Sequence, residues 1–147
     1  MVLSKDFKEF IALLNAHEVQ YIVVGGYAVA FHGYPRYTKD IDLWVLPNPA
    51  NAEKLLAVLR DFGFASLDLT VEDFSLPNKV VQLGTPPYRI DLMTSISGVN
   101  FQECFPAATE IELDGIKIRF ISLEDLIRNK RSTGRLRDLS DIEELEG

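Results

Sequence analysis

The stretch YIVVGGYAVAFHG at residues 21–33, followed by DIDLWV at residues 40–45, decides the fold of this chain. The apolar, β-branched residues 21–24 are typical of a buried strand, and Gly25 and Gly26 predict a tight turn before an alanine-rich helix. Polar and apolar side chains alternate in residues 40–45. The strand period of two therefore places Asp40 and Asp42 on one face, with their Cα atoms roughly 7 Å apart.

A third carboxylate is expected close to these two. Residues 80–83 and 88–93 predict a hairpin across Gly84, and its second strand carries Asp91 between apolar neighbours. Hard divalent cations prefer carboxylate oxygens, and paired cations about 3.5–4 Å apart bind the attacking and leaving oxygens of a phosphate displacement. The start of the helix after Gly25 and Gly26 offers unpaired backbone N–H groups to a phosphate. The pattern favours metal-assisted phosphate chemistry, with Mg²⁺ (or Mn²⁺) in a two-ion site.

The motifs resemble those of the DNA polymerase beta-like nucleotidyltransferase superfamily. The resemblance lies in the glycine pair, in the acidic pair Asp40 and Asp42, and in the later strand aspartate Asp91. A further pattern is similar to a branch of small stand-alone prokaryotic members, some of which belong to toxin-antitoxin and abortive-infection systems. That pattern comprises Arg36, Thr38, residues 121–127, Lys130, Arg135, Arg137, Asp138, Asp141 and Ile142.

The resemblance implies transfer of a nucleoside monophosphate from a nucleoside triphosphate, ATP among the candidates, to an acceptor hydroxyl with release of pyrophosphate. Asp40, Asp42 and Asp91 would hold the metals, and Asp91 is the expected general base. The triphosphate would meet the backbone of Gly25, Gly26 and Tyr27 and the side chains of Arg36, Thr38 and Lys130. The acceptor is left open between a tRNA end, a protein hydroxyl and a small molecule.

Three features have competing explanations. Arg36 and Thr38 fit either a triphosphate contact or a surface ion pair with Asp40. Trp44 shares the face of Asp40 and Asp42 and fits either a base-stacking role or core packing. Lys130 belongs to a basic segment, residues 117–137, that either receives phosphates or pairs with the acidic tail at residues 138–146. An alternative for the whole chain is a non-catalytic partner with this fold that binds a cognate toxin, an antitoxin or nucleic acid.

Composition narrows the class further. With 147 residues and 47% hydrophobic content, the chain is expected to form a single domain, residues 1–147, with a substantial core. A formal charge of −7 argues against a general nucleic-acid coat. The single cysteine fits a reducing compartment, and no apolar run suits a signal peptide or a membrane span. We expect a cytoplasmic protein with no membrane contact.

Periodicity and capping residues predict the other elements. Helices are expected at residues 7–14 after Ser4, at 49–62 between Asn48 and Gly63, and at 122–133 before a short closing helix. Residues 110–113 and 116–120 predict a hairpin, and residues 64–78 are ambiguous between a short strand and a helical turn. The expected fold class is α/β (α+β), with a small mixed or largely antiparallel sheet and helices packed mainly on one face.

Overall fold

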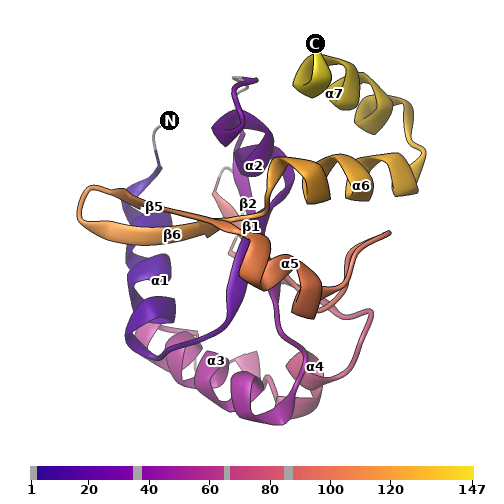
Figure 1. Ribbon diagram of the computed structural model, residues 1–147. Helices are drawn as coiled ribbons and strands as arrows, with labels where there is room; N and C mark the ends of the chain where they lie inside the picture. The colour runs from indigo at the N-terminus through magenta and orange to yellow at the C-terminus, as the bar shows by residue number, and fades with distance from the viewer. Residues whose placement is uncertain (1–2, 35–37, 65–66, 85–87) are drawn as a thin grey trace.

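A computed structural model describes residues 3–34, 38–64, 67–84 and 88–147 and contains a six-stranded mixed sheet (Figure 1). The predicted mixed α/β fold is confirmed. The strand order is β3-β4-β2-β1-β6-β5. The strands are β1 (Tyr21–Val24), β2 (Asp40–Val45), β3 (Val80–Leu83), β4 (Arg89–Met93), β5 (Thr109–Leu113) and β6 (Ile116–Phe120).

Strand register brings the three predicted acids together. β1 pairs antiparallel with β2 and sets Val24 opposite Asp42, so the glycine turn that follows Val24 begins beside this carboxylate. β2 pairs parallel with β4 and sets Asp42 opposite Asp91. Residues directly opposite each other on neighbouring strands point to the same face. One end of the β1-β2-β4 unit therefore carries the glycine turn and all three carboxylates.

The helices begin and end close to the expected residues. Ser4, Asn48 and Ser122 each accept a hydrogen bond from a backbone N–H in the first turn of the following helix. Gly63 and Gly134 end two of these helices in the left-handed conformation. The helices are α1 (Lys5–Ala16), α2 (Gly25–Phe31), α3 (Pro49–Phe62), α4 (Val71–Ser75), α5 (Phe101–Ala107), α6 (Leu123–Thr133) and α7 (Leu136–Glu146).

Two short helices add to the expected elements. α4 resolves part of the ambiguous segment: Thr70 and Asp73 form a capping box at its start. The strand considered at residues 64–67 includes residues 65 and 66, which lie outside the described part of the chain. α5 contains Pro106 within only seven residues and was not expected. Its Phe101 packs edge-on against Trp44, with the ring centroids 5.2 Å apart, on the face of β2 that also carries Asp42.

One hydrophobic core joins the sheet to its helices. It includes Phe7, Phe10 and Leu14 of α1, Leu55 of α3 and Leu126 of α6, each at most 1% exposed. Figure 1 shows α6 and α7 on the same side of the molecule as α2, with α3 and α4 at the opposite end. None of the helices described is both long and apolar enough to cross a membrane.

Candidate active site

The glycine turn exists because two side chains approach the backbone where β1 meets α2. Gly25 has φ +69°, and a Cβ there would lie 2.0 Å from Oδ2 of Asp42. A Cβ on Gly26 would lie 2.4 Å from Oγ1 of Thr38. Both distances are far inside van der Waals contact, so a larger residue at either position would displace Asp42 or Thr38. The glycine pair and the carboxylate thus form one packed unit.

The three acids converge on a cavity of about 490 Å³ at this end of the sheet. Most residues that line it are charged. The lining consists of Gly25, Gly26, Thr38, Lys39, Asp40, Asp42, Arg89, Asp91, Lys130, Arg135, Arg137 and Asp138. The cavity therefore has an acidic wall from β2 and β4 and a basic wall from α6 and the start of α7.

Arg89 connects two of the acids. Its Nε and Nη2 donate to the two carboxylate oxygens of Asp91 at 2.8 and 3.1 Å, and Nη2 also lies 3.1 Å from Oδ2 of Asp40. Arg89 is two residues before Asp91 on β4, so both side chains share one face. The guanidinium therefore offsets the charge of Asp40 and Asp91.

The surroundings of Asp42 oppose its ionisation. Burial, followed by the nearby carboxylates Asp91 and Asp40, raises the pKa of its carboxyl from 3.8 to about 7, while Arg89 opposes the shift. Among the residues that the structure describes, no group of three or more His, Cys, Asp and Glu is already arranged to hold a metal ion.

In the basic wall, the contacts of Lys130 differ from the triphosphate contact expected for this residue. This side chain lines the cavity, but the residue is only 6% exposed, and its Nζ donates to Asp138 at 3.0 Å and to Asp141 at 2.9 Å. Asp138 also accepts from Thr133 and from Arg135, each at 2.6 Å. Burial opposes ionisation of Asp138, but these hydrogen bonds outweigh it and lower its pKa to about 2. The basic segment had two possible explanations, contact with phosphates or pairing with the acidic tail. The contacts of Lys130 agree with the second, pairing with the acidic tail.

The remaining predicted site residues differ in whether they line the cavity. Gly25, Gly26 and Thr38 line the cavity with the three acids. Tyr27 is 6% exposed, packs edge-on against Phe7 and is not among the residues that line the cavity. Arg36 lies outside the described residues. Trp44 is 2% exposed and fills space beneath α5, as the packing alternative predicts.

Sequence reasoning missed Arg89 and Lys39 and placed too little weight on Arg137. Arg137 is exposed and lines the cavity, and the structure gives it no ion pair among the described residues. A signal for Arg89 was present, because the period of two that pairs Asp40 with Asp42 also places Arg89 beside Asp91. The position of Arg137 in the cavity depends on how α7 packs against α6. No local sequence pattern predicts this packing.

Comparison with known proteins identifies the protein family to which this chain belongs. A glycine turn against an acidic pair, with a third acid on the neighbouring parallel strand, is the arrangement expected of a nucleotidyltransferase. Residues 3–147 match the model of a family described as nucleotidyl transferase of unknown function. The chain belongs to this family, and the expected enzyme class is confirmed. A search of curated proteins gave no match.

Solved structures with the same fold include several nucleotidyltransferases. A Thermotoga maritima protein assigned as a nucleotidyltransferase is 17% identical with a TM-score of 0.63, over 94% of this chain and 88% of that one. The lincosamide antibiotic adenylyltransferase LnuA, solved with lincomycin, is 20% identical with a TM-score of 0.59, over 99% and 98% of the two chains. ANT(2″)-Ia, solved with adenylyl-2″-tobramycin, is 13% identical with a TM-score of 0.58, over 95% and 84%. At these identities the likeness concerns the fold.

Proposed function

We propose that this chain transfers a nucleoside monophosphate from a nucleoside triphosphate to an acceptor hydroxyl in a Mg²⁺-dependent reaction. The observation that carries the proposal is the position of Asp42. It lies against the glycine turn, it is crowded by Asp40 and Asp91, and its pKa is raised to about 7 by burial and by those carboxylates. A buried cluster of like charges beside a helix start is suited to a cation and a phosphate together.

The donor set fits a hard divalent cation. Asp40, Asp42 and Asp91 offer carboxylate oxygens, which Mg²⁺ and Mn²⁺ prefer. A bound cation would favour the ionised form of Asp42, whereas Asp40 and Asp91 would exchange their contacts with Arg89 for contacts with the cation. A bound metal would supply charge neutralisation at the reacting phosphate.

The residues of this chain then have distinct roles. The backbone N–H groups of Gly25, Gly26 and Tyr27 would face the triphosphate, and Thr38 would hold the turn in place. The exposed guanidinium of Arg137 is better placed than Lys130 for a phosphate contact, because Lys130 is committed to Asp138 and Asp141. The acceptor hydroxyl would attack the α-phosphorus as the bond to the β-phosphate oxygen breaks. Asp91 would take the hydroxyl proton, and pyrophosphate would leave.

Small-molecule hydroxyls are the acceptor class we favour. The LnuA and ANT(2″)-Ia structures hold lincomycin and an adenylylated tobramycin, and LnuA is matched over 98% of its length. Arg135 and Arg137 form a short basic wall in a chain of net charge −7, which is little surface for a long polyanion such as tRNA.

Incubation with labelled nucleoside triphosphates, Mg²⁺ and a cell lysate tests the proposal. The lysate is separated into RNA, protein and small molecules, and we expect label in the small-molecule fraction. Asp42→Asn is the matched inactive control. Label in RNA or protein would overturn the acceptor class and keep the enzyme. No transfer into any fraction, together with copurification of an unmodified partner, would favour a non-catalytic toxin or antitoxin partner.

A further inference from the structure

Two arginines at the start of α7, Arg135 and Arg137, line the cavity that contains the three acids, and the structure holds them differently. Nε of Arg135 donates to Oδ2 of Asp138 at 2.6 Å, although 74% of the Arg135 side chain is exposed. Arg137 makes no ion pair with any residue that the structure describes. A neighbouring carboxylate therefore orients the first arginine, and no ion pair orients the second.

The bond from Nε leaves the far end of the Arg135 guanidinium available. A guanidinium is planar, and its Nη1 and Nη2 groups form a rigid fork of N–H donors. The structure gives neither of these two nitrogens a partner within the described part of the chain. Such a fork matches two oxygens of a phosphate group. Arg135 is thus an oriented phosphate donor on the cavity wall.

Asp138 can orient Arg135 because other bonds fix its own carboxylate. The residue is 3% exposed, and its Oδ1 accepts from Nζ of Lys130 at 3.0 Å. Its Oδ2 accepts from Oγ1 of Thr133 at 2.6 Å, in addition to the bond from Arg135. Nζ of Lys130 is itself held by a second bond, to Asp141 at 2.9 Å. The carboxylate of Asp138 therefore cannot rotate without breaking a buried hydrogen bond.

The charges of this group of side chains cancel. Lys130 and Arg135 are positive, and their partners Asp138 and Asp141 are negative. Arg135 therefore adds little net attraction for a distant anion, and its contribution depends on the direction of its donors. Arg137 adds net positive charge, and attraction by net charge depends far less on direction.

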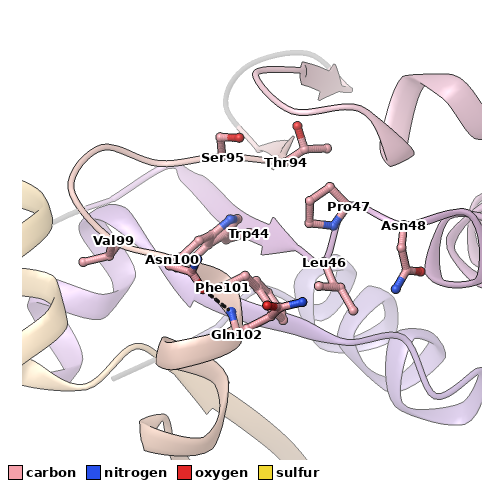
Figure 2. Close-up of a pocket in the computed structure, with 10 residues that line it drawn as sticks. All are labelled: Trp44, Leu46, Pro47, Asn48, Thr94, Ser95, Val99, Asn100, Phe101 and Gln102. Carbon is pink, nitrogen blue, oxygen red and sulfur yellow. Dashed lines mark hydrogen bonds between the residues drawn. The ribbon is translucent and has the colours of Figure 1, made fainter.

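The cavity that contains the three acids is the place where Arg135 can meet a phosphate chain. It joins the glycine turn, the carboxylates and both arginines in one space of about 490 Å³. The cavity beside Trp44 shares no lining residue with it, and none of the ten described residues that line that second cavity is charged (Figure 2). A polyanion would lose hydration there without gaining an ionic partner.

We propose that Asp138 is a positioning residue, which holds Arg135 so that its Nη groups contact the phosphates of the nucleoside triphosphate. Lys130 and Thr133 act one step further away, because they hold Asp138. The inference rests on the proposed function and adds to it a link between the α6–α7 contact and phosphate binding. Lys130 thereby supports phosphate binding without touching the phosphates.

Calorimetry on exposed variants tests the role of Arg135. The probe is whichever of ATP, GTP, UTP and CTP binds wild type most tightly with Mg²⁺. Arg135→Ala should weaken its binding about tenfold, and Arg135→Lys should recover little of this loss, because an ammonium group lacks the fork. Arg137 is the matched comparison: Arg137→Ala should also weaken binding, and Arg137→Lys should recover most of that loss. If Arg135→Lys binds the nucleotide as wild type does, only charge matters at this position and the inference is wrong.

A second pair of variants tests Asp138 itself. Asp138→Asn and Asp141→Asn each remove one buried charge that pairs with Lys130, so both should lower the melting temperature. Asp138 bonds to Arg135 and lines the cavity, whereas Asp141 does not line it, so Asp138→Asn alone should weaken nucleotide binding. The double variant Asp138→Asn/Arg135→Ala should bind no more weakly than Arg135→Ala, because the two residues act through one contact. Losses that multiply, or an equal loss in Asp141→Asn, would give Asp138 a purely structural role.

The outcomes separate this inference from the proposed function. If Asp138→Asn does not fold, Thr133→Val replaces it, because that variant removes only a hydroxyl bond to Asp138. Thr133→Val should weaken nucleotide binding, and an unchanged affinity would overturn the inference. If wild type binds and transfers the nucleotide while the Arg135 variants bind it equally well, the positioning role is wrong and the proposed function stands. If wild type binds none of the four nucleotides with Mg²⁺, both proposals fail.

Discussion

Arg89 sets the charge balance of the carboxylate cluster. Its guanidinium holds both oxygens of Asp91 and reaches Asp40, while Asp42 lies outside these contacts. Asp91 is mostly buried, with 10% of its side chain exposed, so its pairing with Arg89 is worth more than a surface ion pair. Arg89 and a divalent cation would therefore compete for the same oxygens.

This competition predicts the behaviour of Arg89→Ala. In EDTA the variant should melt below wild type, because it loses the charge-assisted hydrogen bonds to Asp91 and the ion pair with Asp40. Added Mg²⁺ should raise its melting temperature more than that of wild type, since the cation no longer displaces a guanidinium. Lys39→Ala is the control, because Lys39 is exposed in the same cavity and makes no ion pair with the carboxylates among the residues that the structure describes. An equal response to Mg²⁺ in wild type and Arg89→Ala would show that Arg89 does not compete with the cation.

At the scale of elements, the junction of β1 and α2 is the most constrained backbone of the site. Gly25→Ala should destabilise the protein for two reasons: the left-handed backbone at φ +69° and the clash of the new Cβ with Asp42. Gly115→Ala separates them, because Gly115 has φ +80° in the β5-β6 turn and no atom within 4 Å of a Cβ built there. We expect Gly115→Ala to cost about 1–2 kcal/mol in urea unfolding and Gly25→Ala clearly more. Equal costs would mean that Asp42 moves aside freely.

The contact between α6 and α7 depends on a buried cation. Lys130→Ala should destabilise the protein by about 3–5 kcal/mol, because Asp138 and Asp141 would stay buried without their shared partner. Arg131→Ala should cost less than about 1 kcal/mol, since its pair with Glu146 is exposed. Urea unfolding of both variants measures the difference. Similar costs would show that α7 docks through its apolar contacts instead.

Local patterns predicted most of the elements, and the reasons are physical. Capping side chains, glycine stops and strand alternation act within a few residues, so Ser4, Asn48 and Gly134 were readable from the sequence. The short helix α5 was not, because Pro106 and seven residues leave no helical period. The partners of Lys130 also escaped prediction. Asp138 and Asp141 reach it after the turn at Gly134, and that geometry is a tertiary property.

At the scale of the whole molecule, the three acids were predictable as a set, but their charge state was not. Strand alternation gives the face of Asp40, Asp42 and Asp91, and the parallel pairing of β2 and β4 then brings them together. The pKa of Asp42 is raised because the residue is buried beside Asp91 and Asp40, while the hydrogen bonds and ion pair of Arg89 go to those two acids. Neither the burial nor the position of Arg89 can be read from the local sequence. The pH dependence of folding follows from the raised pKa of Asp42.

Asp42 should make the cation-free protein less stable as the pH rises. Burial and the neighbouring carboxylates Asp91 and Asp40 raise its pKa from 3.8 to about 7 in the folded state. Between these two values the folded chain holds a proton that the unfolded chain has released. The stabilisation is complete below pH 3.8 and is lost as the pH rises through about 7. A shift of this size corresponds to on the order of 4 kcal/mol as an upper bound.

Asp42→Asn should remove this dependence. In EDTA we expect it to match wild type near pH 4 and to exceed it in unfolding free energy at pH 8, because the amide does not ionise. Asp138 does not interfere, because its pKa is lowered to about 2 and its contribution is lost below pH 4. The measurement is urea unfolding at several pH values, with the exposed Asp68→Asn as control. Mg²⁺ at pH 8 should stabilise wild type more than Asp42→Asn, since the cation offsets the charge that the variant lacks. Parallel stability curves for the two proteins would mean that Asp42 is not the strained carboxylate and that the site is organised around Asp40 and Asp91.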